Sequence, residues 1–489
     1  MKRLGLIVCL VAGALLTGCT VGPKYNRPPV PAPPAWKTEA PWTVAAPADT
    51  LPKGAWWQIF NDDLLNSYEG QLLGANQSLV AARERLNNAR SLARIASAAF
   101  FPQMLTDPSS QRTRVSGNRP LLSAKPPLAP DTENVFAIPF DISYEADLFG
   151  RVRRNLEAAN ASLQATAADL GNVQLVLTSE LAADYFSLRE LDSEIGVVQE
   201  LVDIEQKGLD LVQRRHQGGV ASGLELAQQA ALLDATVAQV SLLQQQRAQF
   251  EHAIAVLTGN PASSFSVPAA PLQGIPPTVP IGIPSDMLQR RPDVATSERN
   301  MAFQNAQVGI ATAAFYPHIT LSGSGGWQSR DITTLLNAPS AFWSLGTDLL
   351  QPVFSGGRNR ANLAAAQAAY NESVADYREA VLTAFQQVED GLSGLQTLSK
   401  ASATQQTAVD DSRRALTLAN NRYTGGLTTY LDVITAQTTL LNNQRLATQL
   451  LGQQMVTSVF LVKALGGGWD VSEVRNEQVH PKAVQAIQQ

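Results

Sequence analysis

Few residues of this sequence could carry out covalent or metal chemistry. Its 489 residues include only two cysteines, Cys9 and Cys19, both within the first twenty positions. The four histidines are scattered without the spacing of metal ligands, so a zinc enzyme is not expected. The sequence contains neither a Gly-x-Ser-x-Gly elbow nor a phosphate-binding loop. Cys19 is therefore the one reactive position that stands out, and no catalytic residue, metal or cofactor is predicted.

Cys19 ends an N-terminal export signal. Two basic residues precede an apolar run over residues 4–16, which is shorter than the ~20 residues that a membrane-spanning helix needs. The following Leu16-Thr17-Gly18-Cys19 resembles a bacterial lipobox, which implies cleavage before the cysteine and attachment of lipid to it. Several acyl chains on one residue form a stable anchor. Residues 1–18 are predicted to be a signal peptide, and residues 19–55 a lipidated, extended, proline-rich tether.

Composition excludes some classes of function. Lys and Arg number 37 against 42 Asp and Glu, so the formal net charge is −5 and a dedicated nucleic-acid binder is not expected. Charged residues make up only 16% of the chain, compared with about 25% in typical globular proteins. Beyond the export signal no stretch reaches 18 continuous apolar residues. A membrane-spanning part would therefore have to consist of β-strands.

The body of the chain is duplicated. Four motifs occur twice in the same order: Ala98–Pro102 and Ala313–Pro317, Leu148–Arg151 and Val353–Arg358, Arg215–Val220 and Arg422–Leu427, Leu257–Gly259 and Ala464–Gly466. A unit of about 200 residues is far longer than the 20–50 residues of solenoid repeats. The predicted division is a first repeat of helix, strand pair and long helix pair (56–260), a connector (261–284), a second repeat (285–468) and a C-terminal tail (469–489).

Each repeat contains a long heptad pattern. Apolar residues recur every seven positions, shift once by four, and then resume: Leu156, Leu163, Leu170, Leu177, then Leu181, Leu188, Ile195, Val202, Leu209. This pattern, which the second copy shares, predicts a helix of roughly 65 residues, about 100 Å long. Each should end at Gly218 or Gly425 in the left-handed conformation and return as a second helix, 224–257 or 431–465. This pattern is consistent both with an ordinary antiparallel coiled coil and with a larger helical cylinder.

Alternating residues predict strands between the helices. Period-two alternation covers 136–148, 318–327 and 343–349, with lengths that match tilted membrane-spanning strands; a half-buried soluble sheet stays possible. Strand 103–116 contains Asp107-Pro108 and should be frayed, bent or shifted in register. Four strands cannot close a barrel, which takes about eight, and lipid does not tolerate an open edge. The chain is therefore expected to oligomerise.

Several motifs together resemble one family. They are Val21–Tyr25, Trp56-Trp57, Phe60–Leu64 and Arg291–Val294, in addition to Cys19 and the duplicated plan. In combination they resemble the TolC-like outer-membrane factors of tripartite efflux systems, specifically NodT-type lipoproteins. The resemblance implies an α+β membrane protein: a trimeric 12-stranded outer-membrane β-barrel, with four strands per chain, continuous with a long periplasmic α-helical barrel. An equatorial domain of N-terminal, connector and C-terminal segments is implied between them.

The resemblance also implies a function without enzyme activity. Such proteins are passive exit ducts for drugs or toxic compounds, anchored by lipid in the bacterial outer membrane. Their implied partners are two further copies of the chain, a periplasmic adaptor and an inner-membrane transporter, often of the resistance-nodulation-division class. The alternative within transport is the exit duct of a type I protein-secretion system. Two further hypotheses explain less of the sequence. A periplasmic lipoprotein enzyme is not supported by any catalytic motif, and a lipid-anchored coiled-coil scaffold does not account for the alternating strands.

The helix-to-helix turns are the implied site. The resemblance assigns adaptor contacts to these periplasmic tips: Gly218, Gly219, Val220, Gly425, Gly426 and Leu427. Glu225 and Asp432 follow the tips at corresponding positions. In a trimer they could form carboxylate rings at the pore constriction, or they could be solvated residues that suit a helix start. Arg422 and Tyr423 are the second choice for gate contacts.

Two motifs are predicted to be structural. In Arg291–Val294 the proline should preset the first turn of a helix, within about 285–314, and Asp293 should cap it. A corresponding helix is expected at about 64–99. Trp56-Trp57 is interpreted as packing within the equatorial domain and not as a ligand site.

Overall fold

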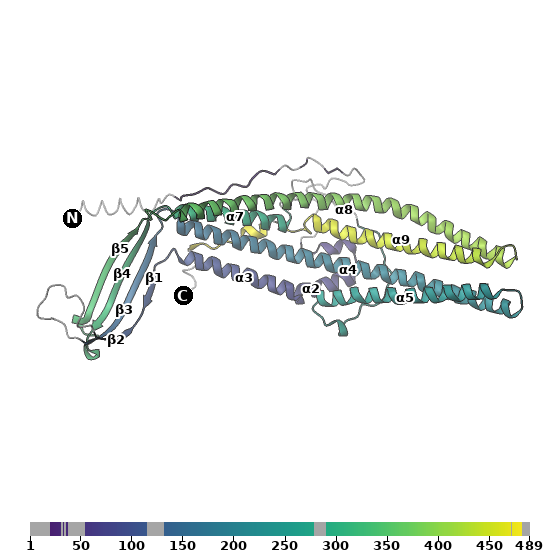
Figure 1. Ribbon diagram of the computed structural model, residues 1–489, viewed down its shortest axis with the longest axis horizontal. Helices are drawn as coiled ribbons and strands as arrows, with labels where there is room; N and C mark the ends of the chain where they lie inside the picture. The colour runs from purple at the N-terminus through teal and green to yellow at the C-terminus, as the bar shows by residue number, and fades with distance from the viewer. Residues whose placement is uncertain are drawn as a thin grey trace.

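Two helical hairpins and one β-sheet lie at opposite ends of the long axis in a computed structural model (Figure 1). The structure describes residues 20–30, 33, 36–37, 54–114, 132–277, 290–470 and 472–481. Cys19 and the predicted signal peptide lie outside the described residues. In the part that is described, no helix combines the length and the apolarity needed to cross a membrane.

The elements follow the duplicated order. The first repeat holds η1 (Trp56–Phe60), α2 (Asp63–Ala75), α3 (Gln77–Ala98), β1 (Gln103–Thr106), β2 (Ser109–Arg114), β3 (Thr132–Ala146), α4 (Arg151–Gln217) and α5 (Gly223–Leu257). After η2 (Ala262–Ser264), the second holds α7 (Pro292–Ala313), β4 (His318–Ser329), η3 (Ile332–Thr334), η4 (Ala338–Ser340), β5 (Ala341–Leu350), α8 (Arg358–Thr424) and α9 (Tyr430–Ala464). α10 (Ser472–Arg475) lies in the C-terminal tail.

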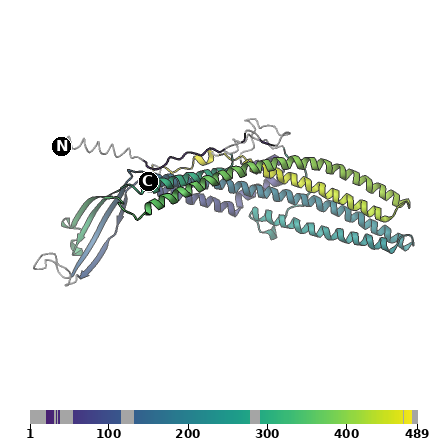
Figure 2. The same ribbon diagram turned by 45° about the horizontal axis from the view of Figure 1, so that its top comes forward.

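The long helices confirm the heptad prediction. α4 and α8 each have 67 residues, and neither breaks at the four-residue shift. Heptad residues such as Leu163, Leu188, Val388 and Leu395 are buried. α4 pairs with α5 and α8 with α9, while contacts between α4 and α9 join the two hairpins. Figures 1 and 2 show the four helices running side by side to the two tips.

The shorter helices differ in two ways from expectation. The predicted helix over 64–99 is divided into α2 and α3 at Asn76, whose side-chain oxygen accepts from the Leu79 N–H (3.0 Å) and whose amide donates to the Leu257 carbonyl (2.9 Å). Asn76 therefore caps α3 and ties it to the end of α5.

At the start of α7, Pro292 occupies the first helical position as predicted. The prediction that Asp293 caps this helix is wrong, because the N-cap residue is Arg291. Asp293 lies in the first turn and accepts a bidentate ion pair from the Arg291 guanidinium (3.0 and 2.6 Å). Arg291 also donates to the Ala464 carbonyl (3.0 Å), so the motif joins α7 to the end of α9 and is structural.

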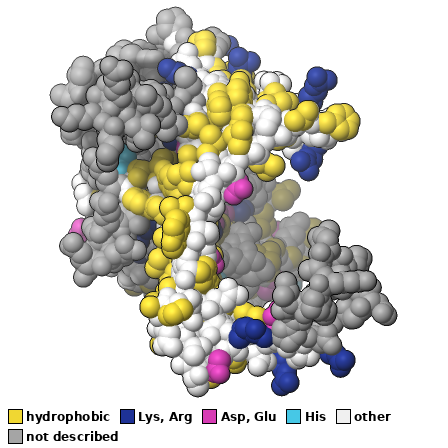
Figure 3. All heavy atoms as spheres, turned by 90° about the vertical axis from the view of Figure 1, so that its left-hand side faces the viewer, with side chains coloured by type: hydrophobic (Ala, Val, Ile, Leu, Met, Phe, Trp, Pro, Cys, Tyr) yellow, Lys and Arg dark blue, Asp and Glu magenta, His cyan; other side chains and the backbone are white. Residues whose placement is uncertain are grey.

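The strands form one antiparallel sheet in the order β1-β3-β4-β5, with β2 also paired to β3. Its register places Met104, Ile142, Gly323 and Leu345 in one row across the sheet. The neighbouring row, on the opposite face, consists of Gln103, Ser143, Ser322 and Gly346. Hydrophobic side chains gather along the sheet in the end view of Figure 3. One face is thus apolar and the other polar, as expected for strands between lipid and water.

The first strand is interrupted but keeps its register. β1 and β2 flank Asp107-Pro108, and both pair with β3 in one continuous alignment, from Gln103 opposite Ser143 to Arg114 opposite Thr132. The predicted interruption is confirmed, and a shift of register is excluded. Pro108 removes one ladder donor, while the six paired residues on its far side restore the alignment.

The main core lies where both repeats meet. Trp56, Tyr185, Tyr377 and Met301 belong to one buried cluster contributed by η1, α4, α8 and α7. Trp56 also donates from its indole N–H to the Thr178 hydroxyl (3.2 Å). Both members of the Trp56-Trp57 pair are buried, as their interpretation as packing residues requires.

Candidate functional site

The two hairpin tips have the same backbone structure. Val220 N–H donates to the Arg215 carbonyl (2.8 Å), and Leu427 N–H donates to the equivalent Arg422 carbonyl (2.9 Å). The left-handed residue is the second glycine of each pair, Gly219 (φ 75°) or Gly426 (φ 71°). The prediction of this conformation for Gly218 and Gly425 is therefore wrong by one position, since both have φ near −80°.

Each tip exposes apolar side chains. Val220 is 69% exposed and Leu427 is 74% exposed. Leu224 and Leu431, in the first turns of α5 and α9, are also exposed. These four residues lie at the two helix-to-helix turns, at the end of the molecule farthest from the sheet (Figure 1). Exposed apolar groups at such a point are typical of a surface that binds another protein.

The two predicted gate carboxylates occupy equivalent positions. Glu225 and Asp432 are the third residues of α5 and α9. Ser222 accepts from the Glu225 N–H at 3.2 Å, and the Thr428 hydroxyl donates to the Asp432 carboxylate. Both carboxylates are thus placed at helix N-termini, where a negative charge is favourable. Asp432 is exposed and Glu225 half-buried, so both can also reach solvent near the tips.

Arg422 and Tyr423 do not act together within the protomer. Arg422 is exposed, whereas Tyr423 is 6% exposed and packs between the hairpins. The Arg215 guanidinium lies over the Tyr423 ring (4.6 Å to the centroid), and the Tyr430 ring is 4.9 Å away. Burial raises the pKa of Tyr423, and the nearby Arg215 opposes that rise. Tyr423 therefore joins α8 to α4 just above the tips.

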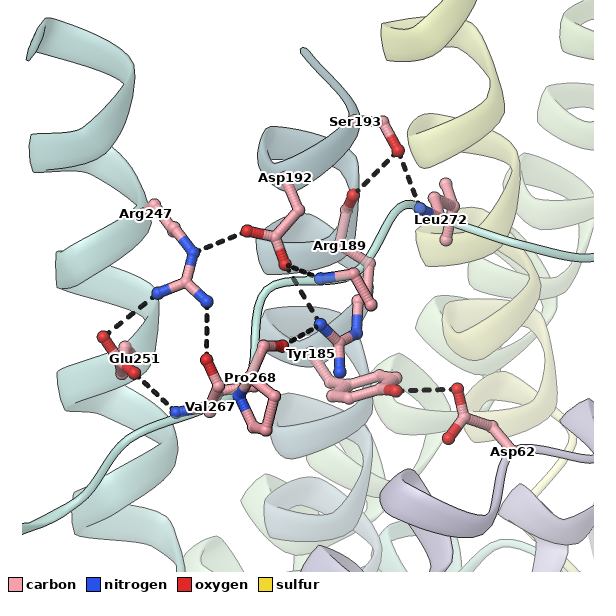
Figure 4. Close-up of polar contacts among 11 residues, drawn as sticks. Asp62, Tyr185, Arg189, Asp192, Ser193, Arg247, Glu251, Val267, Pro268 and Leu272 are labelled. Carbon is pink, nitrogen blue, oxygen red and sulfur yellow. Dashed lines mark hydrogen bonds and ion pairs between the residues drawn. The ribbon is translucent and has the colours of Figure 1, made fainter. Parts of the chain in front are cut away.

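Sequence reasoning missed a polar clasp between the connector and the first hairpin (Figure 4). Arg247 of α5 donates to Asp192 of α4 (2.5 Å), to Glu251 (3.1 Å) and to the Val267 carbonyl (2.7 Å). Arg189 donates to Asp192 (3.0 Å) and to the Pro268 carbonyl (2.6 Å).

Asp192 is 3% exposed at its side chain and accepts from both arginines. The sequence could have indicated this contact through its charges. Charged residues make up only 16% of the chain, yet Arg189 and Asp192 lie within one turn of α4, and Arg247 and Glu251 lie about one turn apart on α5.

The N-terminal segment is bound along the helices. Val21 N–H donates to the Phe149 carbonyl (3.1 Å), and Arg154 donates to the carbonyls of Val21 (3.2 Å) and Gly22 (3.1 Å). Tyr25 donates to Glu298 of α7, and Arg27 donates to Tyr377 of α8 (2.8 Å). This part of the predicted tether is therefore extended but docked. It begins beside the junction of β3 and α4, where the sheet meets the helices.

The sequence matches a model of a known protein family. The model described as "Outer membrane efflux protein" covers residues 70–260 and again 283–467. The pyoverdine export outer membrane protein OpmQ of Pseudomonas aeruginosa is 33% identical over 96% of this chain and 97% of its own length. The solvent efflux pump outer membrane protein SrpC of Pseudomonas putida is 31% identical over 94% and 97%. Both relatives thus match nearly from end to end.

The fold also matches solved structures. The outer-membrane channel OprN is 29% identical and superposes with a TM-score of 0.84, covering 92% of this chain and all of that one. The Campylobacter jejuni CmeC outer membrane channel, at 23% identity, has the same TM-score and supports the fold alone.

The duplicated hairpins, the two-faced sheet and these matches define a trimeric outer-membrane channel with a periplasmic helical extension. The chain belongs to the outer membrane efflux protein family, in its NodT and OprM type. It is a channel of efflux pumps and has no enzymatic role.

Proposed function

We propose that this channel is the lipid-anchored exit duct of a tripartite pump that exports small molecules such as drugs or toxic compounds. A periplasmic adaptor binds the hairpin tips, and an inner-membrane transporter, of the resistance-nodulation-division class, supplies the energy. The exposure of Val220, Leu224, Leu427 and Leu431 is the observation that carries this proposal, because exposed apolar groups at two equivalent tips suit one repeated partner.

The lipid is proposed to be attached to Cys19, which immediately precedes the first described residue. Support comes from Thr20, which packs against the start of α4: a Cβ atom at Gly150 would lie only 2.9 Å from the Thr20 Cα. Lipid on Cys19 would therefore emerge beside the ends of the strands, at the height of the membrane surface. Mass spectrometry of the mature N-terminal peptide should find the acylated cysteine, and an unmodified N-terminus would overturn this part.

The gate is proposed to lie at the tips, with Glu225 and Asp432 in carboxylate rings and Arg422 and Tyr423 beside them. The adaptor contact is assigned to Gly218, Gly219, Val220 and to Gly425, Gly426, Leu427. The symmetric placement of the two carboxylates supports the rings.

The adaptor contact can be tested by introducing charge at the exposed apolar residues of the tips. The double variant Val220→Asp/Leu427→Asp should lose co-purification with the adaptor and lose efflux, because it places charge in an apolar contact. Ile275→Asp, at an exposed apolar residue of the connector, is the matched control and should keep both. Undiminished adaptor binding by the double variant would contradict the assignment of the tips.

A further inference from the structure

A cavity of about 490 Å³ lies where the two hairpins meet, between α4 and α9. Its volume falls within the 300–1,000 Å³ of typical small-molecule sites. Four of its lining residues are apolar: Leu191, Leu398, Val456 and Phe460. The lining also includes the carboxyl groups of Glu190 and Glu194 together with side-chain amides. Such a cavity suits a ligand with an apolar body and a positive charge.

Glu194 is already neutralised by the protein. Its side chain is 2% exposed, and it accepts from Arg445 Nε at 2.5 Å and from Gln449 at 3.4 Å. Arg445 is held by a second partner, because the Gln239 carbonyl oxygen, in the amide orientation that satisfies both groups, accepts from its guanidinium (3.0 Å). The hydrogen bonds of the Arg445 guanidinium are thus made to Glu194 and Gln239.

Glu190 forms no ion pair with an arginine among the described residues, and its side chain interacts with that of Glu194. Its Oε1 atom is buried and accepts no hydrogen bond from the described residues. Among the residues that line the cavity, Glu190 and Glu194 are the titratable groups, both from α4, while α5 contributes Gln246 and α8 contributes Leu398. Burial raises the pKa of Glu190 to about 7; the charge of Glu194 and a hydrogen bond with that carboxyl add to the rise, and Arg445 opposes it. A proton on this carboxyl is therefore exchangeable for another cation near neutral pH.

The cavity and the polar clasp share one turn of α4, because Glu190 directly follows Arg189. Glu190 and Asp192 are two residues apart and so point about 200° apart around α4. Asp192 faces the connector through Arg189 and Arg247. Phe460 is 51% exposed on α9 and offers an aromatic surface at the rim.

We propose that the α4–α9 cavity is a binding site for organic cations in the wall of the duct, with the Glu190 carboxylate as their counter-ion. Apolar groups of the cation contact Val456 and Phe460. The side-chain amides of the cavity provide polar contacts in place of the water that the cation loses on binding. This proposal rests on the proposed function, whose substrate class it narrows. The second repeat lacks an equivalent site, because Thr397 and Ala401 stand 207 residues after the two glutamates.

Binding of tetraphenylphosphonium to the purified full-length trimer, by equilibrium dialysis, tests the site. We expect the wild type to bind at least tenfold more tightly than Glu190→Gln at pH 8. Affinity should fall about tenfold per pH unit below 7, because the proton competes for the same carboxylate. Glu200→Gln, at an exposed residue of α4 outside the cavity, should bind as the wild type does. Tetraphenylborate, of similar shape and opposite charge, should bind to Glu190→Gln no more weakly than to the wild type.

Equal, pH-independent affinity of the wild type and Glu190→Gln would overturn the site. If Glu190→Gln fails to form trimers, Phe460→Ala provides a second test, with an expected loss of several-fold in affinity and no change in the pH profile. Channel conductance of the wild type separates the two proposals. A conducting channel without cation binding refutes the site alone, whereas a bilayer-inert protein refutes the duct itself.

Discussion

The two hairpins share one backbone plan but differ in their charged contacts. α8 begins 207 residues after α4 (358 against 151), and α9 begins 207 residues after α5 (430 against 223). At this spacing the clasp residues Asp192 and Arg247 correspond to Ser399 and Gln454, which are neutral. The two hairpins thus have the same helix lengths and the same tips. The charged residues Asp192 and Arg247, which bind the connector, occur in the first hairpin and have neutral equivalents in the second.

The environment of the long helices explains this difference. α4 contacts α3, α5, α7 and α9, whereas α8 contacts α7 and α9. Leu382 and Leu418 of α8 are more than half exposed within the protomer. We infer that α4 is central to the protomer and that α8 borders the next subunit of the trimer. A central helix buries more polar groups, and most buried polar groups are paired inside the chain.

Breaking the clasp should have the largest effect. Asp192→Ala leaves Arg189 and Arg247 without their shared carboxylate, and loss of one member of a buried ion pair costs about 3–5 kcal/mol. Urea unfolding of the detergent-solubilised trimer, followed by circular dichroism, measures the free energy of unfolding. Ser399→Ala is the matched change in the second hairpin and should cost well under 1 kcal/mol. Similar losses in both variants would contradict the asymmetry.

An intermediate effect is expected at Glu205, which is fully buried with both carboxylate oxygens unpaired. Its equivalent, Ser412, accepts from Asn443 Nδ2 (2.6 Å). Glu205→Ser removes the unpaired carboxyl and should raise the free energy of unfolding by about 1–3 kcal/mol at pH 8.

The gain should shrink toward pH 5. Burial raises the pKa of Glu205 above its ordinary 4.5, so the folded chain keeps a proton that the unfolded chain has lost. The free energy of unfolding of the wild type therefore falls as pH rises above about 4.5. Glu205→Ser has no carboxyl at this position, so its free energy of unfolding should not show this contribution to the pH dependence. A pH-independent gain would show that the carboxyl does not titrate as described.

The smallest expected effect tests what the hairpins share. Gly219→Ala and Gly426→Ala place a Cβ atom at a left-handed residue, which costs about 1 kcal/mol. Gly218→Ala and Gly425→Ala, at residues with φ near −80°, should cost less. Thermal unfolding can compare all four variants. Unequal effects of the two left-handed positions would mean that the tips differ in the assembled trimer.

The sequence predicted the periodic parts of this molecule well. Seven-residue spacing fixed α4 and α8, and period two fixed the faces of β3, β4 and β5, because each pattern repeats over many residues. The break at Asn76 was missed because one capping side chain interrupts an otherwise helical pattern. The αL residue was placed one position early, since both glycines of each pair satisfy the same signal.

The contacts between distant segments were not predictable in the same way. The Arg247–Asp192 clasp joins residues 55 positions apart, and Arg445–Glu194 joins residues 251 apart. Their pairing depends on which helix faces lie together, which single-sequence periodicity leaves open. The candidate gate was found through equivalent positions in a duplicated unit, and its role stays a proposal.

Planar-bilayer recording of the purified trimer tests most directly the claim that the tips hold the constriction. The wild type should show a small, cation-preferring conductance. Glu225→Ala/Asp432→Ala should weaken the cation preference, because it removes all six carboxylates from the proposed rings. Glu200→Ala/Glu379→Ala, at exposed residues of α4 and α8, should behave as the wild type does. Unchanged selectivity and conductance in the tip variant would contradict a constriction at the tips.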